Sequence, residues 1–321
     1  MNAIENFYEV VKFGRPEYIP WKTPDYGLRY HGSNHEDFEG HGHHSPVGTE
    51  WTDIWGTVWH KDLPDVMAFP KRFPLEDLET LDAYTFVDPD GEKYTGLIAE
   101  LLEKHNPKEA ILAGSHRDTL WERAYMLVGM ETLMEYFYTE PDLVKRLFRK
   151  ITDFHLRMAE HYVAAGCKIA YLSDDHGTQN SLLLGEKIIR EFFLPEYERL
   201  FGYYKANGVL INFHSCGHIE PMLDIFMDLG VDILNPIQAS ANDLDAIRAK
   251  TQGRMAILGG VNSEVLMNGT ADEIRDLTKL RMEQLGKNGG YICTPDQWMP
   301  FPKDAVEILE DTVQKYGRYP L

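Results

Sequence analysis

A histidine and a cysteine two residues apart end one of the most apolar stretches of the chain. The run at 209–213 stops at His214, and Cys216 follows. Residues i and i+2 at the end of a strand point to the same side. With Cys293, they form a set of imidazole and thiolate ligands that suits zinc, and three protein ligands leave the fourth position open, as in catalytic sites. The alternative is a polar loop with two inert, buried thiols.

A compact acid and base cluster follows another apolar run. Asp174, Asp175 and His176 come directly after the run at 169–172. Carboxylates and imidazole at a strand end can position a substrate or transfer a proton, so we predict a catalytic role for these three residues. The alternative is structural, because Asp often caps a loop or a helix.

Other polar side chains at strand ends are candidates for substrate binding. His116 and Arg117 follow the run at 110–113, and the guanidinium could clamp an anionic group. Gln238 and Asn262 follow two later runs. From the aromatic N-terminal part, we add Trp55 as a candidate for substrate binding, with ordinary packing as the alternative.

The elements that must position these residues alternate along the chain. Short apolar runs are separated by amphipathic stretches such as 141–165, 186–206 and 271–286. The six clearest runs lie at 110–113, 169–172, 209–213, 231–234, 255–258 and 291–293. Two further strands are expected at 17–20 and 54–59. This alternation predicts an α/β fold with a parallel sheet, and a count near eight favours a single (β/α)8 TIM barrel over residues 1–321. In such barrels the chemistry lies at the carboxyl ends of the strands.

The segment 29–60 departs from this pattern. It is rich in His, Gly and Trp and has no helical periodicity, so we expect a long loop or insertion near the barrel mouth. Its histidines at 31, 35, 41, 43 and 44 could bind a metal, but preorganised sites are seldom built on flexible loops. A mobile loop over the mouth is the favoured interpretation.

Composition excludes several classes of function. The 321-residue chain has a formal net charge of −19, which disfavours binding to nucleic acids and anionic membranes. Its three cysteines do not suggest a disulfide framework. No apolar run reaches the length of about 18 residues that a membrane helix needs, and no signal peptide is evident, so we expect a cytoplasmic protein.

The stretches at 173–201, 209–238, 257–277 and 288–309 together resemble the uroporphyrinogen decarboxylase superfamily. The resemblance is stronger to its zinc-dependent, corrinoid-linked methyltransferase branch. It implies a (β/α)8 barrel and a Zn²⁺ ion held by an HxC pair and a later cysteine, at positions matching His214, Cys216 and Cys293.

The resemblance also implies a function. We expect a methyltransferase that moves a methyl group between a small molecule, such as an aryl methyl ether, and a corrinoid on a partner protein. Alternatives are a methylcobalamin:thiol methyltransferase, a metal-free decarboxylase-like lyase and a non-catalytic binding barrel. The segment at 19–32 lacks the Arg-rich motif with which the decarboxylase binds its carboxylate-rich substrate, which disfavours the lyase.

Overall fold

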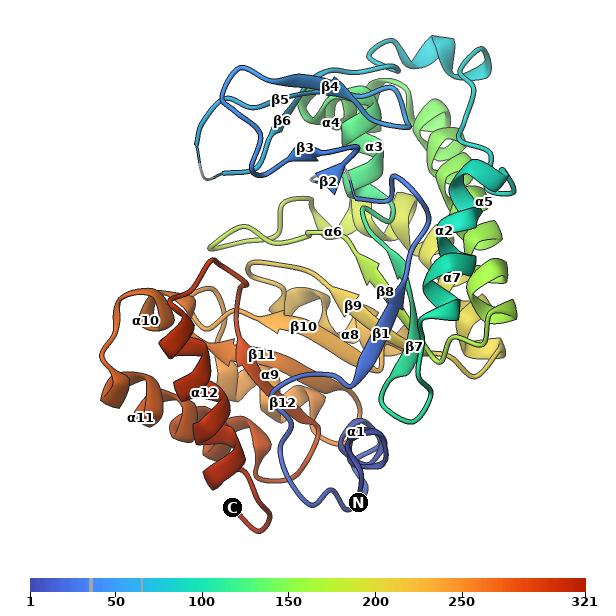
Figure 1. Ribbon diagram of the computed structural model, residues 1–321. Helices are drawn as coiled ribbons and strands as arrows, with labels where there is room; N and C mark the ends of the chain where they lie inside the picture. Colours follow the sequence, from blue (N-terminus) through green and yellow to red (C-terminus); the bar gives the residue numbers. More distant parts are fainter. Residues whose placement is uncertain (35–36, 65) are drawn as a thin grey trace.

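The computed structural model describes residues 1–34, 37–64 and 66–321. It has an α/β architecture in which a curled parallel sheet is covered by helices, as in a TIM barrel (Figure 1). The strands are β1 (Asp25–Leu28), β7 (Ile111–His116), β8 (Ile169–Ser173), β9 (Leu210–His214), β10 (Ile233–Ile237), β11 (Ala256–Val261) and β12 (Tyr291–Pro295). They lie side by side in this order. The expected fold class is therefore confirmed.

The number of strands differs from the prediction, since the described residues form a parallel sheet of seven. The run at 17–20 is not one of them. It nevertheless borders the sheet, because the Cys293 amide donates a 2.9 Å hydrogen bond to the carbonyl of Pro20. The first strand, β1, begins only at Asp25, beyond Pro24. Pro20 and Pro24 delay the start of this strand, because proline has no amide hydrogen to donate to a β-ladder.

The helices cover the outer face of the sheet, with one exception. Those of the first half are α1 (Ala3–Val11), α2 (Glu92–Glu103), α3 (Trp121–Val128), α4 (Met130–Thr139), α5 (Pro141–Ala164) and α6 (Glu186–Ile188). Those of the second half are α7 (Leu194–Ala206), α8 (Leu223–Asp228), α9 (Leu244–Thr251), α10 (Ser263–Asn268), α11 (Ala271–Arg281) and α12 (Lys303–Tyr316). Among the helices of the described residues, none combines the length and the apolar character that a membrane crossing requires.

The exception is α1, which closes the end of the barrel where the strands begin. A capping box between Asn2 and Glu5 starts this helix, with a 2.8 Å hydrogen bond from the Glu5 amide to Asn2 Oδ1. Its buried face packs on the first inward-facing residue of several strands. This apolar plug consists of Phe7, Val10, Val11, Ile111, Ala113, Ile169, Ile233, Ala256 and Ile292.

The N-terminal segment that follows β1, here taken as far as residue 72, forms two small antiparallel sheets at the other end of the molecule from α1 (Figure 1). Their strands are β2 (Asp37–Phe38), β3 (His41–Gly42), β4 (Glu50–Thr52), β5 (Val58–His60) and β6 (Phe69–Arg72). The run predicted at 54–59 therefore contributes to β5, outside the barrel. Asp53 organises the segment, because its carboxylate accepts hydrogen bonds from the Trp55 amide and the Trp59 indole. The buried Arg123 on α3 lies 3.8 Å from the same carboxylate and so connects the segment to the barrel.

Candidate metal centre at the barrel mouth

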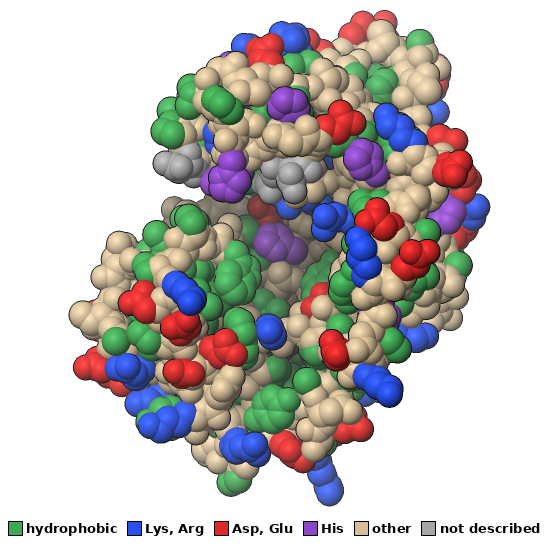
Figure 2. Space-filling model, in the orientation of Figure 1, with side chains coloured by type: hydrophobic (Ala, Val, Ile, Leu, Met, Phe, Trp, Pro, Cys, Tyr) green, Lys and Arg blue, Asp and Glu red, His purple; other side chains and the backbone are tan. Residues whose placement is uncertain are grey.

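A cavity of about 720 Å³ opens at the carboxyl ends of β7 to β12. In the space-filling view the molecule is hollowed between its two halves, with histidine side chains at the rim and inside (Figure 2). The lining combines polar groups on the strand ends with Met67 from the N-terminal segment and Trp298 from the loop after β12. The volume falls within the range of about 300–1,000 Å³ that is usual for small-molecule sites.

Three potential metal ligands converge in this cavity: Asp175, His214 and Cys216. His214 Nε2 lies 3.3 Å from Cys216 Sγ and 3.6 Å from Asp175 Oδ1. Tetrahedral zinc, with bonds of about 2.0–2.3 Å, separates its N, O and S donors by roughly 3.3–3.6 Å. The two distances from His214 Nε2 have the spacing that a zinc ion requires, all three donor atoms lie within 4.8 Å of one another, and their types suit this metal.

The loops after β8 and β9 hold these ligands in place. The Cys216 amide donates to Asp175 Oδ1 at 2.7 Å, and the Ser215 hydroxyl accepts from the His176 amide at 3.0 Å. The two loops touch at Gly177 and Gly217. A Cβ on Gly217, whose φ is +81°, would lie 2.5 Å from the backbone of Gly177. Only glycine allows this approach and this conformation, so the ligand geometry depends on both glycines.

The electrostatics of the mouth are acidic. Burial, followed by the Asp175 carboxylate, raises the pKa of the Cys216 thiol. Burial and the carboxylates of Asp118 and Asp175 raise the pKa of Glu122 well above its usual value. The Ser173 hydroxyl donates to Glu122 Oε2 at 3.2 Å. A bound cation would offset this concentration of negative charge and would favour the thiolate form of Cys216.

Cys293 is not brought to the other proposed ligands. Its neighbour Ile292 points into the barrel and packs on the α1 plug, so the alternation of the strand turns Cys293 outward into the helical layer. There the hydroxyl of its neighbour Tyr291 donates to the Gly259 carbonyl at 2.8 Å, and burial raises the pKa of Cys293 to about 12. The structure thus places Asp175, which we expected to be catalytic, at the position of the third ligand.

Asp174 and His176 also face away from the mouth. Asp174 accepts hydrogen bonds from the amides of Leu120 and Glu122, at 2.8 and 3.0 Å, and so caps the start of α3. It accepts a further bond from the Tyr197 hydroxyl, and burial raises its pKa to about 7. His176 is buried in an aromatic cluster 2.9 Å from the same hydroxyl, and burial lowers its pKa to about 4. The geometry of Asp174 and His176 therefore supports a structural role and not the predicted catalytic one.

Of the predicted substrate-binding residues in the N-terminal half, only Arg117 presents its side chain to the mouth. Arg117 lines the mouth with its side chain 36% exposed. His116 is also a lining residue of the cavity, but its imidazole is directed between the helices, with Nδ1 3.0 Å from His155 Nδ1 and Nε2 in contact with the Tyr204 hydroxyl. Trp55 is fully buried against Phe154, with ring centroids 4.7 Å apart, and belongs to the hydrophobic core.

Gln238 and Asn262 support loops beside the mouth. The Gln238 side chain accepts a hydrogen bond from the Gly217 amide, which braces the loop that carries Cys216. Asn262 caps α10 through a 2.8 Å bond from the Glu264 amide. Both residues line a smaller neighbouring cavity of about 470 Å³.

Gln297 and Glu122 are among the residues of the mouth that the sequence prediction missed. Gln297, in the loop after β12, places its Oε1 atom 3.5 Å from Cys216 Sγ. Glu122 reaches the mouth from α3. Neither lies directly after an apolar run, so the search at strand ends could not find them. Gln297 is four residues beyond Cys293, at the point where the chain leaves the strand and turns over the mouth.

The histidines of the N-terminal segment do not form a second metal site among the described residues, where the mouth holds the one set of three close ligands. His41 stacks on Trp51 with ring centroids 5.7 Å apart, and the rings of His43 and His44 lie 5.1 Å apart. His35, which we included in the sequence prediction, lies outside the described residues.

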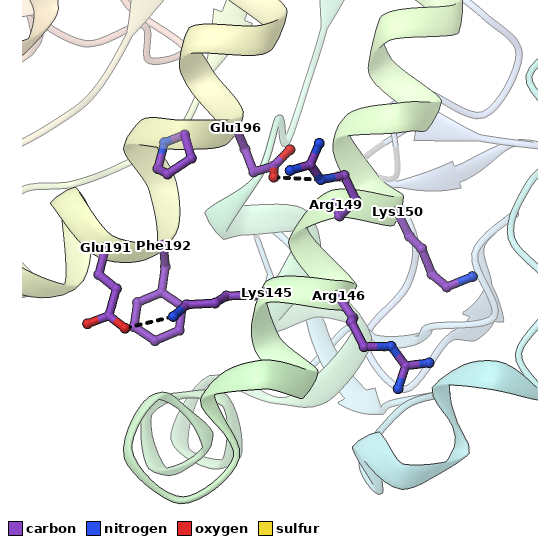
Figure 3. A pocket seen from close by; sticks show the side chains of 8 residues that line it. Lys145, Arg146, Arg149, Lys150, Glu191, Phe192 and Glu196 are labelled. Atoms are coloured by element: carbon purple, nitrogen blue, oxygen red, sulfur yellow. Dashed lines mark hydrogen bonds and ion pairs between the residues drawn. The ribbon is translucent and has the colours of Figure 1, made fainter.

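A further cavity, of about 400 Å³, lies on the outer face between α5 and α7 and is lined by several Lys and Arg side chains (Figure 3). Lys145 pairs with Glu191 at 2.8 Å, and Arg149 pairs with Glu196 at 3.0 Å (Figure 3). Arg146 pairs with Asp82. Because these cations already have carboxylate partners, the groove offers less for a ligand to bind than the mouth does.

Comparisons with known proteins agree with this architecture. The model of the family described as "Uroporphyrinogen decarboxylase (URO-D)" matches residues 61–316. The chain belongs to the uroporphyrinogen decarboxylase family. This is an enzyme family. The match includes the six barrel strands from β7 to β12, and it leaves out residues 1–60, which contain α1, β1 and the strands β2 to β5.

Individual relatives are more distant. Uroporphyrinogen decarboxylases from Anaeromyxobacter sp. (strain Fw109-5) and Anaeromyxobacter dehalogenans (strain 2CP-C) are 26% and 27% identical over 195 and 199 residues. Each alignment covers 59% of this chain but 53% of the relative, so the chain matches about half the length of these curated proteins. A solved structure titled "methyltransferase from Methanosarcina mazei" superposes with a TM-score of 0.70 at 15% identity. That superposition covers 98% of this chain and 99% of the other, which shows a shared fold.

Proposed function

We propose that this protein is a zinc-dependent methyltransferase that moves a methyl group between a small molecule and a corrinoid carried by a separate protein. The observation that supports it most is the convergence of Asp175, His214 and Cys216 at zinc-ligand spacing in an open mouth. Three ligands leave a position for a substrate atom, as in catalytic zinc sites. The fold shared with a methyltransferase is consistent with this proposal.

The walls of the cavity favour an aryl methyl ether as the small molecule. Tyr125, Tyr171 and Trp298 line the cavity together with Met67. Aromatic side chains pack favourably against an aromatic ring, and methionine adapts to its edges. Trp298 and Met67 are 59% and 42% exposed, so they also offer an apolar rim on which a partner protein could rest.

The residues of the mouth have definite tasks in such a transfer. Bound zinc would supply Lewis acidity toward the ether oxygen. The bond between oxygen and methyl carbon breaks with its electron pair on oxygen, while the electron pair of cob(I)alamin forms the new bond to the methyl carbon. Glu122 lines the cavity and has a pKa raised by burial and by neighbouring carboxylates, so it is the group that would deliver a proton to the departing oxygen. The product is then a neutral hydroxyl compound.

The charge of the mouth argues against the metal-free lyase. Asp118, Glu122 and Asp175 line the cavity, whereas Arg117 is the one Lys or Arg among its lining residues in the described part of the chain. A substrate with many carboxylates would meet repulsion there that one guanidinium cannot offset. A thiol in place of the ether is the closer alternative, because zinc also activates thiols.

The metal proposal is tested by elemental analysis of the purified protein. We expect about one zinc per chain in the wild type and in Cys293→Ala, and less than about a tenth of that in Asp175→Ala and Cys216→Ala. Loss of zinc from Cys293→Ala with retention in Asp175→Ala would restore the cysteine as third ligand. Absence of zinc from the reconstituted wild type would remove the metal-dependent mechanism altogether.

The transfer itself is tested with cob(I)alamin and a panel of methoxyarenes, followed by the absorbance change on methylation. We expect activity that a chelator abolishes and zinc restores. Activity with methylcobalamin and thiols alone would select the thiol methyltransferase, and turnover that survives chelation would select the lyase. Bound zinc without turnover of either class would indicate a binding barrel.

A further inference from the structure

The interior of the barrel contains a line of hydrogen-bonded side chains that ends at His214. His214 Nδ1 lies 3.1 Å from Asn235 Oδ1 on the neighbouring strand. Asn235 Nδ2 contacts Asn212 Oδ1 and lies 3.4 Å from the carbonyl of Phe213. The register explains these contacts, because Asn235 is paired with His214 and therefore shares its inward-facing side.

A second group of polar side chains lies next to Asn212, toward the first strand. Tyr171, the register partner of Asn212 on β8, hydrogen-bonds to Asp25 Oδ1 at 3.2 Å. Thr23 donates to the same carboxylate oxygen. Asn212 Nδ2, by contrast, is buried and makes no hydrogen bond with the described residues.

These contacts give the line a direction. The fixed reference is the backbone carbonyl of Phe213, which can accept from Asn235 Nδ2 but cannot donate. The Oδ1 atom of Asn212 then faces Asn235 and accepts from its Nδ2. Rotating the Asn235 amide by 180° would point its oxygen at the Phe213 carbonyl, which is unfavourable. Asn235 Oδ1 is therefore an acceptor toward the imidazole of His214.

We propose that Asn235, oriented by the Phe213 carbonyl and by Asn212 Oδ1, fixes His214 as the tautomer protonated on Nδ1. The unprotonated Nε2 then faces Cys216 Sγ and Asp175 Oδ1, where the metal would lie. The hydrogen bond on one ring nitrogen of a histidine determines which nitrogen can ligate a metal. Asn235 is thus a positioning residue. The proposal deepens the proposed zinc site, although the tautomer itself exists without metal.

The test is a nitrogen NMR experiment on the metal-free protein labelled with ¹⁵N-histidine, at an alkaline pH where imidazoles are neutral. The His214 signals are assigned by their absence in His214→Gln. We expect Nδ1 to be of the protonated type and Nε2 of the unprotonated type in the wild type. Asn235→Ala, which removes the acceptor for Nδ1–H, should show an averaged mixture of tautomers.

Zinc affinity is measured in parallel on the same proteins. Asn235→Ala should bind zinc about 10–100-fold more weakly. The control is Asn262→Ala, which removes an amide beside the mouth but outside the line, and which should change neither the tautomer nor the affinity. Zinc binding by a wild type whose His214 is protonated on Nε2 would overturn this inference and leave the metal site standing. An Nδ1-protonated His214 in a protein that does not bind zinc would overturn the metal site and leave the inference standing.

Discussion

The two ends of the barrel are built from the same strands but differ in chemistry. At the end where the strands begin, the inward residues are apolar and pack on Phe7 and Val10 of α1. Two or four residues later the same strands present Ser173, His214 and Asn235 to a cavity. A dry, filled end gives the barrel stability, and an open polar end is available for chemistry. The variants below test whether stability and chemistry separate in this way.

The largest effect is expected at the apolar end. Phe7 is fully buried, so Phe7→Ala should lower the free energy of unfolding by about 3–5 kcal/mol, because it leaves a cavity. The measurement is denaturant unfolding, together with zinc content of the folded fraction, which should not change. The control is Tyr138→Ala, since Tyr138 is 78% exposed and its removal should have little effect on unfolding. A Phe7→Ala protein that keeps its stability would show that α1 is no plug.

The reverse result is expected at the mouth. His214 has a side chain that is 35% exposed, and its removal takes away a proposed ligand but little packing. His214→Ala should weaken zinc binding by more than about 100-fold and abolish methyl transfer. The free energy of unfolding of the metal-free protein should change by less than about 1 kcal/mol. A large loss of stability would mean that the mouth also holds the fold together, and the comparison would fail.

An intermediate effect is expected where the two loops touch. Gly217→Ala forces a Cβ into the backbone of Gly177 at a positive φ, so it should cost about 1–3 kcal/mol of stability and also weaken zinc binding. Gly208→Ala is the matched control. Gly208 has a φ of +68° but no atom within 4 Å of the added Cβ, so its variant should lose stability without losing zinc. Equal zinc affinities for the two variants would contradict the role of the loop contact.

The smallest effect at neutral pH is expected for the buried histidine pair His116 and His155, and it grows only as the pH falls. Burial lowers the pKa of His155 to about 3, and burial together with His155 lowers that of His116. The unfolded chain takes up protons below about pH 6.5 while the native state does not, so stability should fall as the pH drops from 6.5 toward 3. His155→Leu should remove up to about 1.4 kcal/mol per pH unit from this slope. The exposed His44→Gln is the control and should leave the slope unchanged.

The sequence predicted the sheet well where periodicity was strong. All six of the clearest apolar runs lie in or beside strands of the barrel, and helices cover the stretches between them. It failed at the N-terminus, where the run at 54–59 is equally apolar but pairs with β4 and β6 in a separate sheet. Local pattern indicates that a segment is extended, whereas its partner strand depends on contacts distant in the sequence.

The candidate site divides in the same way. Types and spacing were enough to place His214 and Cys216 together, because residues at i and i+2 share a side of a strand. The third ligand was decided by tertiary structure. Cys293 has the better ligand chemistry, but Ile292 faces the apolar plug, and so the strand turns the thiol away.

The sequence by itself thus determined the fold class, the end of the barrel that carries the chemistry and two of the three proposed ligands. Those features depend on hydrophobic periodicity and on side-chain direction within one element. Only the tertiary structure decided that Asp175 reaches the pair, that Asp174 caps a helix instead, and that Asn235 orients His214. These outcomes depend on the phase of each strand against its neighbours, which is fixed when the core packs.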